Sequence, residues 1–207
     1  MYLSVNGELE TQKIIEKSRF ITTSKHISGE EEAKDFIADI RRKFPDATHN
    51  CYAYIADNLG NFPRFSDDGE PSGTAGMPIL EVIKNKKLFE TVVVVTRYFG
   101  GIKLGAGGLV RAYSGSAAEN LDSAEKVLYE TCAESEYSVD YSSVDAVMRF
   151  CAENSASLLN TLYKDEVVFI IAVKKTDEEK FNSALINRLN GKVKIRKLQE
   201  YFFPFKI

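Results

Sequence analysis

The chain has 207 residues, of which 44% are hydrophobic, and a formal net charge of −3. Its length fits one large domain or two small ones, and its net charge excludes a protein that binds polyanions over its whole surface. No apolar run reaches the roughly 18 residues of a membrane span, and the N-terminus lacks a signal-peptide pattern, so we expect a cytoplasmic protein. Three widely spaced cysteines predict reduced, buried thiols and no disulfide framework: Cys51, Cys132 and Cys151.

The first 130 residues alternate between patterns typical of strands and of helices. Strands are expected at 9–15, 19–27, 50–56 and 91–99. Helices are expected at 30–44, 78–87 and about 109–123. The strand at 91–99 is nearly all β-branched, which is typical of a strand buried on both faces.

The pattern after residue 130 predicts a second, smaller unit. Strands are expected at 131–141, 157–163, 167–174 and 192–203, with one helix after Ser142 or Ser143 and another between Thr176 and Asn190. The resulting order, β-α-β-β-α-β, is the ferredoxin-like arrangement. We therefore predict an α+β chain of two domains, 1–130 and 131–207.

Two unusual loops, each leading into a predicted helix, hold the residues that suggest chemistry. The first spans 64–78, and the second spans 97–108 and packs five glycines into nine residues: Gly100, Gly101, Gly105, Gly107 and Gly108. The second loop brings free backbone N–H groups to a positive helix end, beside Arg97, Lys103 and Arg111. This predicts an anion-binding loop, RNA phosphate included, although neither the Walker nor the dinucleotide fingerprint fits. The alternative is a tight turn packed against a neighbouring segment.

Acidic residues and a Cys–His pair are the other candidates in this half. Asp67, Asp68 and Glu70 could hold Mg²⁺, but we favour their pairing with Arg97 or Arg111 to join the two loops, and we expect no metal. His49 and Cys51 face the same side of one strand about 7 Å apart, which is too far for direct proton transfer. We therefore expect a buried Cys51, and no catalytic residue is assigned.

The last predicted strand alternates cations with apolar residues. Lys192, Lys194 and Arg196 share one face, and aromatic residues follow at Tyr201, Phe202, Phe203 and Phe205. A basic sheet face with aromatic rings suits single-stranded nucleic acid. The alternatives are a solvated charged face or edge, with the aromatic residues in the core.

Both glycine-bearing motifs resemble those of the IMPACT family, also called the YigZ or YvyE family. The first motif is R-F-S-D-D-G-E-P-S-G-T-A-G from Arg64, and the second is R-Y-F-G-G-I-K-L-G-A-G-G-L-V-R-A-Y from Arg97. The segment H-N-C-Y-A-Y from His49 is similar as well, and the resemblance covers essentially the whole chain. It implies an N-terminal domain with the fold of the second domain of a small-subunit ribosomal protein. It also implies that the ferredoxin-like C-terminal domain resembles domain V of elongation factor G, as in bacterial two-domain members.

Eukaryotic relatives of this kind regulate translation by competing for the activator of an amino-acid-starvation kinase. No RWD-sized segment precedes the motifs in this sequence, so we expect no such kinase role. The resemblance implies a translation-linked regulatory protein that binds RNA or the ribosome, or a translation-related protein, with no established reaction. We also expect no cofactor and no membrane partner. Two alternatives stay open: an enzyme or binding protein for a phosphorylated small molecule in the cleft between the two loops, and a protein-interaction module.

Overall fold

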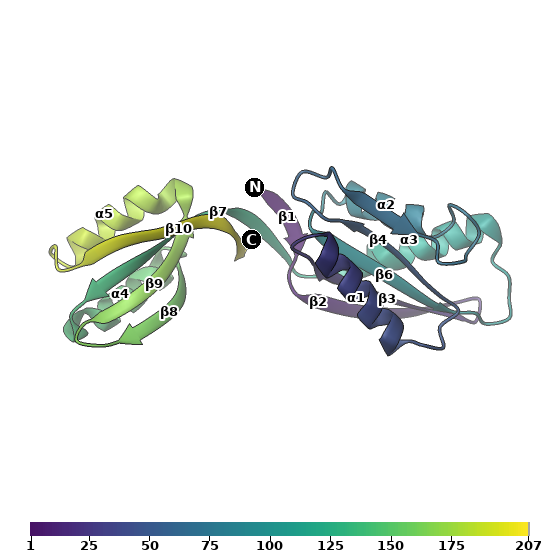
Figure 1. Ribbon diagram of the computed structural model, residues 1–207, viewed down its shortest axis with the longest axis horizontal. Coiled ribbons are helices and arrows are strands. Elements are labelled where there is room, and N and C mark those ends of the chain that lie inside the picture. The colour runs from purple at the N-terminus through teal and green to yellow at the C-terminus, as the bar shows by residue number, and fades with distance from the viewer. Residues whose placement is uncertain (207) are drawn as a thin grey trace. The chain divides into compact units, whose positions relative to one another are not determined.

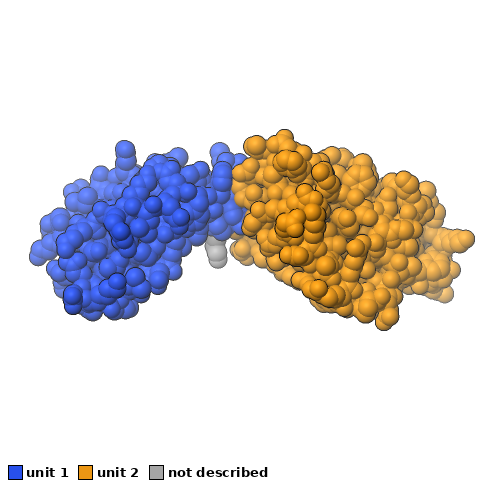
Figure 2. All heavy atoms as spheres, viewed as in Figure 1, with its two compact units in different colours: residues 1, 129–205 blue, residues 2–128, 206–207 orange. Residues whose placement is uncertain are grey.

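The computed structural model describes residues 1–206, which form two compact units (Figures 1 and 2). The N-terminal unit holds residues 2–128 and the C-terminal unit holds residues 129–205. The chain passes from the first to the second within one long strand, β7 (Lys126–Val139). None of the helices within residues 1–206 is long and apolar enough to cross a membrane.

A five-stranded antiparallel sheet in the order β2-β3-β6-β4-β5 forms the centre of the N-terminal unit. Its strands are β2 (Glu8–Ile15), β3 (Ser18–His26), β4 (His49–Ile55), β5 (Pro63–Ser66) and β6 (Thr91–Tyr98). Helix α1 (Glu30–Lys43) covers one face, and α2 (Gly76–Asn85) and α3 (Gly105–Ser123) cover the other (Figure 1). A short strand at the N-terminus, β1 (Tyr2–Val5), pairs with β7.

Strand β6 shows why this sheet is buried on both faces. Val93 and Val95 pack with the residues of α2 and α3, while Val92 and Val94 pack with those of α1. All four side chains are fully buried, as the β-branched run predicts. The alternation also places Arg97 on the same face as Val95, toward α2 and α3.

Three expectations for this unit are corrected. Helix α3 begins at Gly105 and not near Leu109, so the second half of the glycine loop is the first helical turn. Glycine disfavours helix, yet the packing of Leu104 and Leu109 against the core holds this turn in place. The segment 63–66, expected to be loop, forms the edge strand β5, and β1 was not expected at all.

In the C-terminal unit, a sheet in the order β10-β7-β9-β8 has the helices α4 and α5 packed on one face. Its elements after β7 are α4 (Val144–Glu153), β8 (Ser157–Tyr163), β9 (Val167–Lys174), α5 (Glu178–Arg188) and β10 (Lys194–Lys206). Two short 3₁₀ turns, Tyr141–Ser143 and Lys175–Asp177, precede the helices. The element order is the predicted β-α-β-β-α-β.

Candidate functional site

The site lies where the central strands of the N-terminal sheet end beneath α2 and α3. In the register of the sheet, Arg97 of β6 lies opposite His49 of β4 on one side and Phe20 of β3 on the other. Thr48 Oγ1 accepts a hydrogen bond from the N–H of Phe99 at 3.0 Å, and Ser18 Oγ accepts one from Gly100 at 3.2 Å. These two bonds position the start of the glycine loop at the end of β6.

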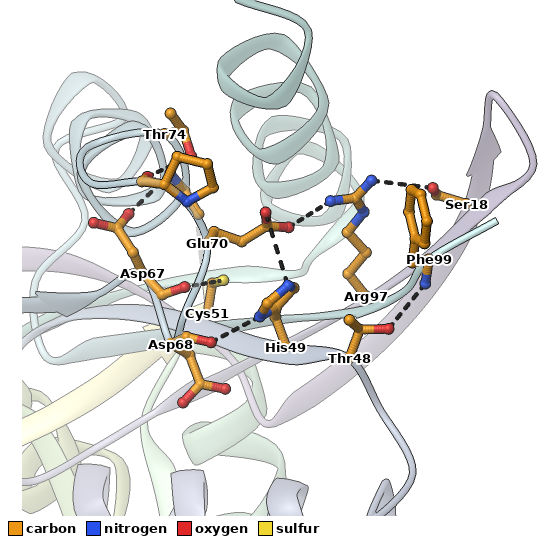
Figure 3. Close-up of polar contacts among 12 residues, drawn as sticks. Ser18, Thr48, His49, Cys51, Asp67, Asp68, Glu70, Thr74, Arg97 and Phe99 are labelled. Carbon is orange, nitrogen blue, oxygen red and sulfur yellow. Dashed lines mark hydrogen bonds and ion pairs between the residues drawn. The ribbon is translucent and has the colours of Figure 1, made fainter. Parts of the chain in front are cut away.

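A buried ion pair joins the two motif loops (Figure 3). Glu70 Oε1 accepts from Arg97 Nη1 at 2.6 Å and from the Tyr113 hydroxyl at 2.8 Å. Arg97 is 4% exposed and Glu70 8% exposed. Arg97 Nη2 donates to Ser18 Oγ at 3.2 Å, and its guanidinium lies 5.4 Å from the ring centre of Phe20. Removing one partner would leave a buried charge uncompensated, so Arg97 has a structural role.

The other two acidic residues of the first loop, Asp67 and Asp68, bind different partners. The Asp67 carboxylate accepts from the backbone N–H groups of Ala75 and Gly76 at 3.0 and 2.8 Å, and thereby closes the first turn of α2. Asp68 Oδ1 pairs with Arg41 of α1 at 2.6 Å. Within residues 1–206, no group of three or more His, Cys, Asp or Glu side chains could hold a metal ion, and none of these acids pairs with Arg111.

Cys51 is buried, as its alternation with apolar residues predicts. Its Sγ lies 2.9 Å from the carbonyl oxygen of Asp67, and burial raises the pKa of the thiol to about 12. His49 Nδ1 lies 2.8 Å from the Asp68 carbonyl, which can only accept, so Nδ1 carries the proton. His49 Nε2 then faces Glu70 Oε2 at 3.8 Å. A protonated thiol is a poor nucleophile, so this pair gives no covalent chemistry at neutral pH.

The glycine loop needs its glycines for conformation and for close packing. Gly101 and Gly105 have φ angles of 85° and 68°. A Cβ on Gly100 would lie 2.1 Å from the backbone carbonyl of Lys17, so the β2–β3 turn packs directly on this residue. The loop is therefore a tight turn, and it also delivers the chain into α3 with its first turn exposed.

No side chain of the described residues caps the N-terminus of α3, and the first turn contains no acidic residue. Gly105, Ala106 and Gly107 are exposed there. Lys103 precedes the helix and Arg111 follows within two turns; both are exposed, and within residues 1–206 neither forms an ion pair. Free N–H groups and two free cations thus meet at one helix end.

Two hollows flank this helix end. The first, here called the motif hollow, has a volume of about 330 Å³ and lies between the loops, lined by Glu70, Pro71, Arg97, Phe99, Lys103 and Gly105 among others. The second, of about 400 Å³, is lined by Lys103, Arg111, Ile15 of β2 and Glu16 of the following turn, among others. Lys103 lines both, but Arg97 lines only the first and Arg111 only the second. Arg97 and Arg111 thus line different hollows at the helix end, and their convergence on one anion stays a prediction.

The cations predicted on the last strand lie in the other unit and have acidic neighbours. Lys194 pairs with Glu166 at 2.6 Å, and Arg196 Nε donates to Glu136 at 2.5 Å. Lys192 precedes β10 and lines a separate hollow with Glu166 and Lys194. Phe205 is buried with Cys132, and Tyr201 and Phe203 pack against that cluster. These contacts weaken the basic character of the strand.

Sequence comparison settles the family. Residues 16–121 match the family described as "Impact N-terminal domain", and residues 138–192 match a "Domain of unknown function (DUF1949)". This chain belongs to the IMPACT family. It is 40% identical over 195 residues to the IMPACT family member YvyE of Bacillus subtilis (strain 168), covering 94% of this chain and 90% of the relative. It is 33% identical over 188 residues to the IMPACT family member YigZ of Escherichia coli (strain K12), and the match covers 90% of this chain and 92% of that relative.

A solved structure of similar sequence supports the α+β fold. That structure, described as "Crystal structure of an hypothetical protein", is 30% identical in sequence and superimposes with a TM-score of 0.59. The match covers 96% of this chain and 97% of the chain in that structure. The IMPACT segment 16–121 contains the glycine loop and the buried ion pair. It also contains every residue that lines the two hollows, apart from Ile15. The site therefore belongs to the part of the chain that defines the family.

Sequence reasoning missed several residues of the site, among them Ser18, Arg41 and Tyr113. Tyr113 could have been found, because it follows Leu109 by four residues and Ala112 by one, on the buried stripe of α3. Ser18 and Arg41 gave no such signal. They reach the site only because β3 and α1 lie beside it in the folded unit.

Proposed function

We propose that this IMPACT-family protein binds RNA, and through RNA the translation machinery, with the surface around the N-terminus of α3. The observation that carries the proposal is the open helix end: exposed backbone N–H groups that no side chain of residues 1–206 caps, beside Lys103 and Arg111, which form no ion pair within those residues. Backbone N–H groups at a helix N-terminus bind phosphate oxygens, and Lys and Arg neutralise phosphate charge.

An exposed ring and a further cation extend this surface. Phe99 is 46% exposed at the start of the glycine loop, and Lys17 is exposed on the β2–β3 turn that packs against Gly100. Cations that follow a backbone, with an aromatic ring for stacking, are the usual elements of single-strand binding. Because the whole chain has a net charge of −3, the contact is local and involves few phosphates.

Affinity for a single-stranded RNA across a salt series tests the proposal. Replacing both cations, Lys103→Gln with Arg111→Gln, should weaken binding and reduce the slope of log K against log salt by about 1.4, because each lost phosphate contact removes about 0.7. The matched control is Lys34→Gln with Arg42→Gln on α1, which covers the opposite face of the sheet. Unchanged affinity and slope in the first variant would remove the site.

Ribosome co-sedimentation addresses the link to translation. We expect the protein to pellet with ribosomes, to be released by RNase treatment and to lose this association in the Lys103→Gln/Arg111→Gln variant. Retention after complete RNase digestion would point to a protein partner instead.

The motif hollow favours a second candidate function, the binding of a phosphorylated small molecule between the two loops. Its volume of about 330 Å³ lies within the range of small-molecule pockets, roughly 300–1,000 Å³. Salt discriminates between the candidates, because RNA binding weakens steeply with ionic strength and an enclosed site much less.

A further inference from the structure

We propose that the motif hollow holds one nucleotide that carries a phosphate monoester, either the phosphorylated end of an RNA strand or a free mononucleotide. The inference rests on the proposed RNA binding and makes it more specific: the exposed surface of α3 contacts the backbone, while the hollow recognises an end. The volume of the hollow, about 330 Å³, has room for one nucleotide and not for a run of them.

An unsatisfied donor on a buried side chain points to a ligand. Arg97 lines the hollow and is 4% exposed; its two terminal nitrogens bond Glu70 and Ser18, but Nε is buried and has no hydrogen-bond partner within residues 1–206. Buried donors are nearly always satisfied by protein, water or ligand. An anionic oxygen in the hollow is the acceptor that suits a guanidinium.

Donors of two other kinds line the same hollow. Gly105 and Ala106 begin α3, so their backbone N–H groups have no partner within the helix, and Lys103 brings an unpaired ammonium. A phosphate monoester has about two negative charges and three terminal oxygens, whereas an internal diester has one charge and two such oxygens. Donors of three kinds around one small hollow therefore favour the monoester.

Glu70 explains why the ligand is a nucleotide and not bare phosphate. Its carboxylate also lines the hollow, and Oε1 accepts from Arg97 and Tyr113. Oε2 faces His49 Nε2 at 3.8 Å, which is longer than a hydrogen bond. A carboxylate oxygen that is not yet hydrogen-bonded repels phosphate but suits an N–H group of a base. Phe99, Leu104 and Leu109 supply the ring and the apolar walls against which a base packs.

The test compares ligands that differ only at the end, with the wild-type protein at 0.15 M salt. One RNA octamer is prepared with a 5′-phosphate, with a 3′-phosphate and with hydroxyl groups at both ends, and AMP, UMP and inorganic phosphate serve as competitors. A phosphorylated end should bind about tenfold or more tightly than the hydroxyl end. Competition by a mononucleotide but not by inorganic phosphate would support the free nucleotide as the source.

Equal affinity for all three octamers, with no competition by AMP or UMP, would overturn the inference. Salt-dependent binding of the octamers would then persist, so the proposed RNA binding would stand without the pocket. Absence of any octamer binding would overturn the proposed function as well.

A variant that preserves the fold provides the second arm. Ala106 is exposed in the first turn of α3, where a carboxylate stabilises a helix but repels phosphate, so Ala106→Glu should keep or raise Tm and abolish the preference for the phosphorylated end. Ser114→Glu, on the same helix but outside the lining of the hollow, is the matched control. An undiminished preference in Ala106→Glu would contradict the proposal.

Discussion

The two helices on one face of the N-terminal sheet begin in opposite ways. Both α2 and α3 start with glycine after a loop. The first N–H groups of α2 are bonded by the Asp67 carboxylate, and Ala75 and Gly76 are buried. Within residues 1–206, no side chain caps the exposed first turn of α3, and its charged neighbours include Lys103 and Arg111.

The difference shows how a chain can either close or keep open the positive end of a helix. An internal carboxylate stabilises a helix start by about 0.5–2 kcal/mol, and it removes the donors from use. The α3 end forgoes this stabilisation, and an external anion can provide it instead. Because Glu70 and Arg97 join the loops that lead to the two helices, the closed end helps to hold the open end in place.

The largest expected effect comes from breaking that join. Glu70→Gln leaves the Arg97 guanidinium buried without a counter-charge, so the free energy of unfolding should fall by about 3–5 kcal/mol in urea denaturation. The control Asp39→Asn breaks an exposed pair with Arg42 and should change stability little. If the two variants had the same midpoint, the buried pair would not hold the loops.

Next in size is the effect of a methyl group at the start of the glycine loop. Gly100→Ala places Cβ against the Lys17 carbonyl, so we expect a loss of about 1–3 kcal/mol. Gly107→Ala lies in the first helical turns, where Ala is favoured, and its Cβ would meet only the end of Arg111 at 3.6 Å, so stability should rise by about 0.5–1 kcal/mol. Equal effects at both positions would mean that the loop is a flexible linker.

Opening the closed helix end should have a smaller effect. Asp67→Ala removes the acceptor of the first α2 N–H groups and should cost about 0.5–2 kcal/mol, measured by thermal unfolding. Asp57 provides the comparison, because its carboxylate accepts two longer bonds, 3.2 and 3.3 Å, from an exposed turn with no helix behind it. A larger loss for Asp57→Ala than for Asp67→Ala would contradict the capping role.

The smallest effect on stability is expected from the ionisation of the Cys51 thiol. Burial raises the pKa of its thiol from about 9.0 to about 12, so the folded state favours the protonated form. This contribution to stability is complete below the unfolded-state pKa and is lost as pH rises through the folded-state value. At pH 8, thiol reagents should label Cys51 only as fast as the N-terminal unit unfolds. Rapid labelling of the folded protein would show that Cys51 is not a buried, protonated thiol.

Local patterns in the sequence were sufficient for much of the fold. The β-branched run at 92–95 predicts a strand buried on both faces, and the order of elements after residue 130 predicts the second unit. The start of α3 was misplaced because glycine propensity argued against a helix that tertiary packing of Leu104 and Leu109 supports. Short-range signals therefore failed where packing decides the conformation.

The position of the site could be predicted from the sequence, but the pairing of its charged side chains could not. The glycine loop and its cations were evident, yet which of three neighbouring acids bonds Arg97 depends on the path of the loop from Asp67 to Glu70. Asp68, at φ 43°, turns toward Arg41, and only then does Glu70 reach Arg97, which is 27 residues away in the sequence. Pairings at such separations follow from the packed fold and not from spacing.

Amide chemical shifts during an RNA titration test the open helix end most directly. With ¹⁵N-labelled protein, we expect the N–H signals of Gly105, Ala106 and Gly107 to shift as single-stranded RNA is added. The signals of Ala75 and Gly76, which Asp67 already bonds, should stay in place. Shifts confined to other regions such as β10, or equal shifts at both helix ends, would contradict the account.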